Sequence, residues 1–269
     1  MCIFIGSSNA LPSPPECGYN SSRSDHYPWI VYLEHFPIGD KSSKYPTYIS
    51  KGFLIDKQHI LTSTQNVDVS QYLRFDRVFF GEYAHLTENQ TEIKYADRRY
   101  VLDINTHEQA DLAVVKFGPP IVITDEIRPI CLPTRVEDIS RFKFYNYMCT
   151  RYSHAFNAET HPSGHATRTR SLVRRWKKQN CDAYYYVLGA LLFPWQDCFS
   201  ETRLNTCSGD LGGPLMYNDG GYHFAAGVAS QATSIYEIPP NSPTIYVNLM
   251  ETSGKLLEWV VNATETSVN

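Results

Sequence analysis

The sequence predicts an all-β protein, either a β-sandwich or one or more β-barrels. Short segments rich in aromatic and β-branched residues follow one another along most of the chain, a composition typical of strands. Turn-forming residues separate these segments, and no regular helix alternates with them to build a parallel sheet. Only the C-terminal end is predicted to be helical, because Leu256, Leu257, Val260 and Val261 recur at helical intervals.

Ten segments carry the strand pattern, in two sets. The first set comprises residues 29–33, 48–55, 59–62, 77–80, 99–104 and 112–117. The second set lies around residues 146–152, 213–217, 222–229 and 244–249. Ahead of both, residues 6–25 are rich in Ser, Pro and Asn, which predicts an exposed tether and not packed structure.

Composition indicates a globular protein without a strong global charge. Of 269 residues, 42% are hydrophobic and 19% are charged, and 24 basic against 28 acidic side chains leave a net charge of -4. Such a balance does not draw a protein to nucleic acid or to anionic membranes. No apolar run reaches the roughly 20 residues of a membrane span, and nothing in the sequence calls for a cofactor or a metal ion. Residues 1–5 are too short for a signal peptide, so that signal is missing from this sequence or secretion does not use it.

Cysteines and glycosylation sequons together predict a secreted, extracellular protein. Seven cysteines are more than a cytosolic chain of this size usually carries, and none form the close pairs that zinc sites prefer. They are therefore predicted to form disulfides in an oxidising compartment, with at least one left over. The N-glycosylation sequons begin at Asn20, Asn89 and Asn262.

Three motifs, in the right order, resemble the catalytic segments of the trypsin-like serine proteases. Residues 208–215 read Ser-Gly-Asp-Leu-Gly-Gly-Pro-Leu, and the family has its serine where Leu211 stands. Residues 52–55 and 59–65 resemble the strand pair leading to the family's histidine, whose position holds Gln65. Residues 111–116 resemble the aspartate segment, and this member of the triad is kept as Asp111. We expect Asp111 to be either a buried structural carboxylate bound to backbone donors or a surviving binding group.

Cysteine positions support this register. Residues 128–133 resemble the interbarrel connector, whose cysteine in many relatives pairs with one in the prodomain, which implies a bridge from Cys17 to Cys131. Cys181 and Cys198 match the family's bridge ahead of the nucleophile loop. Cys2, Cys149 and Cys207 have no evident family partner, and they stay free or bridge to one another or to another chain.

A bridge that the family uses is lost at both ends. The bridge that pins the histidine loop would join Ser50 to Asn66, and neither position holds a cysteine. A disulfide gains or loses its two ends together, so this joint loss supports the alignment.

The resemblance covers about residues 28–261 and implies two six-stranded antiparallel β-barrels with a C-terminal helix. It divides the chain into four parts: the tether 1–25 with Cys17, the first barrel and connector 26–135, the second barrel 136–250, and the helix and tail 251–269. Together these would form one trypsin-like domain.

The resemblance implies a specificity pocket that differs from that of active relatives. Its base falls at Asn205, and its other positions are Gly209, Asp210, Ser230, Gln231 and Ala232. The family usually has Ser-Trp-Gly where residues 230–232 read Ser-Gln-Ala. Active relatives pair the aspartate before the serine with a cleaved Ile-Val-Gly-Gly-like terminus, whereas residues 23–28 read Arg-Ser-Asp-His-Tyr-Pro.

Loss of nucleophile and base predicts a protease homologue without proteolytic activity. It would act by binding a protein partner, namely a protease, an inhibitor or a substrate. The alternative is residual or unconventional serine-type endopeptidase activity at the degenerate cleft. A third reading is an incomplete gene product without function.

Basic residues cluster around Trp176, within residues 161–179. This stretch is predicted to be a solvated, protease-sensitive loop. The alternative is a docking site for a sulfated glycan or an acidic protein surface. The basic residues are Arg168, Arg170, Arg174, Arg175, Lys177 and Lys178.

Overall fold

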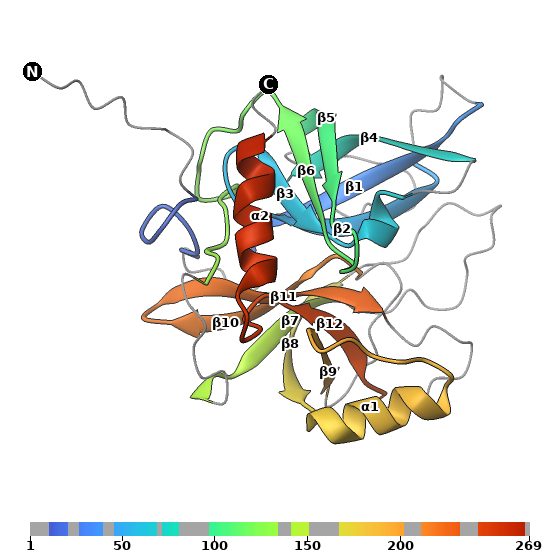
Figure 1. The fold of residues 1–269 in the computed structure, drawn as a ribbon. Coiled ribbons are helices and arrows are strands. Elements are labelled where there is room, and N and C mark those ends of the chain that lie inside the picture. Colours follow the sequence, from blue (N-terminus) through green and yellow to red (C-terminus); the bar gives the residue numbers. More distant parts are fainter. Residues whose placement is uncertain are drawn as a thin grey trace, which may run out of the picture.

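The protein folds as two closed six-stranded antiparallel β-barrels, one above the other in Figure 1, with a helix beside them. This computed structural model describes residues 11–20, 27–39, 46–68, 72–80, 97–133, 141–150, 167–201, 211–231 and 242–266. The predicted fold class, an all-β double barrel with a C-terminal helix, is confirmed.

The first barrel closes in the strand order β1-β2-β3-β6-β5-β4. Its strands are β1 Ile30–Pro37, β2 Tyr48–Leu54, β3 His59–Thr62, β4 Leu73–Phe80, β5 Asp97–Thr106 and β6 Ala113–Gly118. A 3-10 turn, η1 Thr64–Asn66, follows β3 directly. β3 and β6 pair so that Thr62 lies opposite Ala113, and the chain segments just beyond this pair carry Gln65 and Asp111.

The second barrel closes in the equivalent order β10-β11-β12-β9-β8-β7. Its strands are β7 Phe144–Thr150, β8 Thr167–Arg175, β9 Gln196–Glu201, β10 Pro214–Asp219, β11 Tyr222–Gln231 and β12 Thr244–Asn248. Side chains from these strands, among them Phe144, Phe199 and Tyr246, fill its interior.

One hydrophobic core joins the two barrels. Residues of the first barrel and of β10, β11 and β12 belong to a single buried cluster. At its centre Trp29 is fully buried, and its Nε1 donates to Met216 Sδ at 3.2 Å. The barrels therefore pack as one unit, and residues at their junction are held by both.

Two helices flank the barrels, and only one of them was predicted. Helix α2, Lys255–Thr266, confirms the predicted C-terminal helix and buries Leu256, Val260 and Ala263. Helix α1, Lys178–Val187, was not predicted, which corrects the expectation of a single helix. Only Cys181 and Tyr185 of its ten residues are buried. That stripe is too narrow to stand out as a helical pattern. Among the described residues, no helix is long and apolar enough to cross a membrane.

The prediction of a basic loop within residues 161–179 was also wrong for the described residues. Described residues 167–175 form strand β8, and α1 begins at Lys178. Seven of the nine residues of β8 are polar or charged, so this strand lacks the apolar pattern from which strands are predicted, and β9 was likewise not predicted.

The tether is packed at Cys17 and Gly18, contrary to the prediction, whereas residues 13–16 and Tyr19 are exposed as predicted. Cys17 is fully buried and bonded to Cys131. Gly18 donates its N–H to Pro129 O at 2.9 Å and accepts from the N–H of His223 at 2.9 Å. The disulfide and these backbone bonds hold residues 16–19 against the second barrel. Residues 1–10 and 21–26 lie outside the described part.

Candidate functional site

Asp111 lies at the junction of the barrels and receives hydrogen bonds from three residues. Ser63 Oγ lies 2.8 Å from both carboxylate oxygens, and Ser230 Oγ donates to Oδ2 at 2.7 Å. Gln65 donates its Nε2 to Oδ2 at 3.0 Å and its backbone N–H to Oδ1 at 3.2 Å. Asp111 is half-buried, and side chains supply most of its donors. The expectation of a buried carboxylate bound to backbone donors therefore holds only in part, since Asp111 is half-buried and has one backbone donor, the N–H of Gln65.

A capped turn places Gln65 beside Asp111. Ser63 is the N-cap of η1, and its Oγ accepts the N–H of Gln65 at 3.2 Å. Gln65 Nε2 also donates to the backbone oxygen of Ser230, at the end of β11, at 3.0 Å. Both hydrogens of the amide are thus engaged, one by each barrel. A glutamine amide neither accepts nor releases a proton near neutral pH, so this geometry orients Gln65 without making it a base.

Leu211 opens the turn at the nucleophile position and is half-buried. Its side chain offers no oxygen, nitrogen or sulfur, while its backbone oxygen accepts from Asn66 Nδ2 at 2.9 Å. The next residue, Gly212, has φ +80° and donates its N–H to Ala229 O at 2.7 Å. The turn is therefore fastened both to the first barrel and to β11.

Polar contacts take the place of the lost histidine-loop bridge. Asn66 is buried, and its Nδ2 donates to Lys51 O at 3.0 Å as well as to Leu211 O. Ser50 is fully buried, and its Oγ lies 2.9 Å from His35 Nε2. Burial lowers the pKa of His35 to about 4, so this ring is neutral at neutral pH. Ser50 and Asn66, the two positions of the missing bridge, are thus held by separate hydrogen bonds.

Ser63 and Thr64, the hydroxyls closest in sequence to Gln65, are engaged in structural bonds. Ser63 is fully buried and donates to Asp111. Thr64 Oγ1 donates to Leu112 O at 2.9 Å. Neither hydroxyl is bonded to a histidine in the described part of the chain, so neither is placed as an alternative nucleophile.

The structure brings Gln65, Asp111, Leu211 and Ser230 together as the resemblance implies. Gln231 ends β11 and pairs with Ile245 in the sheet. Asn205, Gly209, Asp210 and Ala232 lie outside the described residues.

Both predicted disulfides are confirmed, Cys17–Cys131 and Cys181–Cys198. Of the sequon asparagines, Asn262 is exposed on α2 and Asn20 is half-buried. Asn89 lies outside the described residues.

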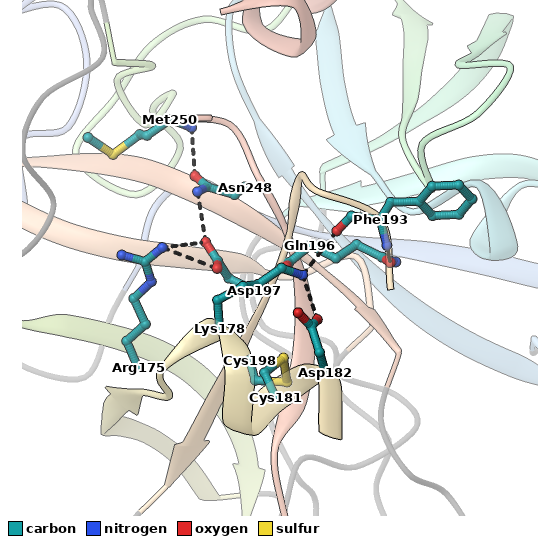
Figure 2. A network of polar contacts seen from close by, with 10 residues as sticks. All are labelled: Arg175, Lys178, Cys181, Asp182, Phe193, Gln196, Asp197, Cys198, Asn248 and Met250. Carbon is teal, nitrogen blue, oxygen red and sulfur yellow. Dashed lines mark hydrogen bonds and ion pairs between the residues drawn. A yellow bond between two sulfur atoms is a disulfide. The ribbon is translucent and has the colours of Figure 1, made fainter. Parts of the chain in front are cut away.

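The basic cluster splits into residues with internal partners and residues facing solvent. Arg175 binds the buried carboxylate of Asp197 at 3.0 Å, which Asn248 Nδ2 also contacts at 2.8 Å (Figure 2). Lys178 Nζ lies 2.8 Å from Asp182 Oδ1. Arg174 and Lys177 are exposed. The spacing of charges in the sequence could not reveal this division.

Sequence reasoning missed Asn66 and Ser63 as members of the polar network around the site. The one available signal was Ser63, because serine just ahead of a short helical turn is a preferred cap. Asn66 gave no signal, since its partner Leu211 is 145 positions away.

Comparisons with known proteins agree with the fold. The family model described as Trypsin matches residues 17–259. The chain is 25% identical to "CLIP domain-containing serine protease B4" of Anopheles gambiae, over 93% of this chain and 73% of that protein. It is 25% identical to "Spaetzle-processing enzyme" of Drosophila melanogaster, over 94% of this chain and 69% of that protein. The double barrel, the retained Asp111 and this match across most of the chain establish that the protein belongs to the trypsin family of serine proteases.

Proposed function

We propose that this chain is a non-catalytic member of the trypsin family that acts by binding proteins. One observation carries the proposal: the amide of Gln65 and the aliphatic side chain of Leu211 occupy the base and nucleophile positions around Asp111. In the triad mechanism a serine oxygen attacks the substrate carbonyl and a histidine moves its proton. Neither side chain can take those roles. In a related mechanism, losing either group lowers turnover by about a million-fold.

The polar network supports a binding role over a decayed site. Gln65 and Asn66 use their amide groups to link the first barrel to the backbone of Ser230 and Leu211. The two chain segments that flank the old cleft are therefore held in place without catalytic side chains. A rigid surface of this kind presents a fixed shape to a protein partner, which lowers the entropy lost on binding.

The partner we propose is extracellular, and is a protease, its inhibitor or its substrate. Two disulfides and the exposed sequon at Asn262 support a secreted protein. The relatives are named as proteases, and one is named for processing Spaetzle. A retained family scaffold can compete with an active relative for the same inhibitor or substrate, which makes those proteins the first to test.

The purified, disulfide-intact protein is expected not to hydrolyse peptides. A serine-directed phosphonate probe should label active trypsin in a parallel sample and leave this protein unlabelled, because Leu211 supplies no nucleophile. A fluorogenic peptide library should give no cleavage above buffer. Labelling that maps to a serine of this chain would support residual serine-type endopeptidase activity and overturn the proposal.

Binding is tested separately, by crosslinking the tagged protein in extracellular fluid of its source and identifying its neighbours by mass spectrometry. We expect a protease, an inhibitor or a protease substrate to be enriched over a tag-only control. Direct binding of the purified candidate must then be measured. If neither step yields such a protein, the binding role loses its support even where activity is absent.

A specific observation favours a second function, the binding of a polyanion such as a sulfated glycan. Arg168, Arg170 and Arg174 all belong to β8, and Arg174 is exposed. Exposed Lys143 directly precedes Phe144, the register partner of Val173. Arginine binds sulfate and phosphate oxygens through its planar guanidinium group. Exposed Arg174 and Lys143 therefore offer positive charge to an extended anion at this end of the β7–β8 pair.

Changing Arg170 and Arg174 to Ser is expected to shift elution from heparin to lower salt. Each lost contact should lower the slope of log affinity against log salt by about one. Arg175 is left unchanged, because its loss would leave the buried carboxylate of Asp197 without a cation. The control changes exposed Lys57 and Lys255 to Ser, which removes the same charge elsewhere. Equal shifts in both variants would contradict a specific site.

A further inference from the structure

An exposed, uncharged segment comprises the last two residues of helix α1 and the loop that follows it. Residues 186–195, here called the apolar loop, read Tyr-Val-Leu-Gly-Ala-Leu-Leu-Phe-Pro-Trp and contain no charged side chain. Its most exposed side chains are Tyr186 at 71%, Val187 at 83%, Leu188 at 55%, Leu191 at 81% and Phe193 at 49%. Single exposed apolar residues are ordinary, but five within eight positions concentrate apolar surface in one short segment.

The apolar loop is held in one conformation at both ends. The disulfide Cys181–Cys198 ties α1 to β9, the two elements that the loop connects (Figure 2). Lys178 Nζ donates to Phe193 O at 3.2 Å and to Gln196 O at 3.0 Å. These bonds bring the end of the loop back to the start of the helix.

Further bonds fix the loop internally. The N–H of Phe193 donates to Gln196 Oε1 at 2.9 Å, and the ring of Phe193 stacks on Trp195 with centroids 4.9 Å apart. At the other end, the N–H groups of Leu188 and Ala190 donate to Tyr185 O at 3.0 and 2.9 Å. The exposed side chains are thus presented on an ordered backbone, so a partner need not order it on binding.

The area of the patch is large for a surface without a partner. The five side chains expose on the order of 600 Å² of mainly apolar surface, the upper end of the largest patch on a typical monomer. One side of a standard protein interface buries about 800 Å². The apolar loop therefore supplies most of the contact that one partner contributes to a stable interface.

We propose that two copies of this chain associate through their apolar loops as a two-fold symmetric dimer. In such a dimer the same patch forms both sides, so residues near the axis meet their own copies. A charged residue near the axis would lie beside the same charge of the second copy and repel it. Residues 186–195 contain no charged residue. A membrane is the other broad surface that could cover an apolar segment, and the net charge of -4 disfavours binding to an anionic one. This inference does not depend on whether the site at Asp111 is catalytic.

Sedimentation velocity of the disulfide-intact protein tests the dimer, from about 1 to about 100 μM, the range in which an interface of modest size dissociates. The wild-type protein is expected to shift from monomer to dimer across this range. Leu191→Asp, or separately Val187→Asp, should weaken association by about 100-fold or more, because two carboxylates would be desolvated beside each other. Both sites are at least four-fifths exposed in one chain, so folding should be unaffected; circular dichroism checks this.

The matched control is Val122→Asp, which places the same charge at a residue that is 78% exposed outside the loop. It should dimerise like the wild type. A wild-type protein that stays monomeric at the highest concentration overturns the proposal, and its pelleting with phosphatidylcholine vesicles would assign the loop to lipid instead. The proposal also fails if both loop variants dimerise as the wild type does, or if Val122→Asp weakens association equally.

Discussion

Gly212→Ala is expected to lower the free energy of unfolding by about 3 to 5 kcal/mol. Gly212 has φ +80°, a conformation that residues with a Cβ rarely adopt. An added Cβ would lie 2.2 Å from Lys51 O, 2.3 Å from Asn66 Nδ2 and 2.3 Å from Thr62 Oγ1. Asn66 Nδ2 and Lys51 O take part in the polar contacts that hold the turn of Leu211 to the first barrel. The substitution therefore combines backbone strain with the loss of those contacts.

Gly189→Ala separates the two effects. Gly189 has φ +82°, but no atom lies within 4 Å of an added Cβ. Only the backbone term remains, and the expected loss is about 1 to 2 kcal/mol. Urea unfolding of both variants and the wild type, followed by circular dichroism, gives the comparison. Equal losses in the two variants would show that the turn at Gly212 is not packed against the first barrel as described.

Removing the bridge Cys17–Cys131 is expected to cost about 4 to 5 kcal/mol of unfolding free energy in the chain-entropy account. The bridge spans 114 positions, whereas Cys181–Cys198 spans 17. A longer closed loop restricts the unfolded chain more, so the double Ala variant of the shorter bridge should lose only about 3 kcal/mol.

The backbone bonds of Gly18 to Pro129 and His223 remain in the first of these variants. The stability lost with the bridge Cys17–Cys131 should therefore arise mainly from a less restricted unfolded state. The circular dichroism spectrum of the folded protein should change little. Urea midpoints and slopes of the two double variants test the order. A larger loss for the shorter bridge would mean that α1 and the apolar loop depend on that disulfide for their folded structure.

Local patterns were sufficient to predict most strands, but not helix α1. Strand β3 was predicted with its observed bounds, because a short apolar and β-branched run between turn residues forms a signal within a few positions. In α1 only Cys181 and Tyr185 are buried. Its stability comes from contacts with distant residues, such as the bond of Tyr185 Oη to Pro243 O at 2.7 Å and the disulfide to Cys198. Most helical stability in proteins arises from packing of this kind.

The proposal that the site is non-catalytic rests on the sequence by itself, because the side chains of Gln65 and Leu211 have neither a basic nitrogen nor a nucleophilic atom in any conformation. The sequence also determined the register of the family motifs, through their order and the cysteine pairs. Only the tertiary structure decided what these residues do instead. Gln65 reaches Ser230 across 165 positions, and Asn66 reaches Leu211 across 145. Such bonds depend on how two barrels pack, and hydrogen bonds between residues so far apart leave no periodic trace in a single sequence.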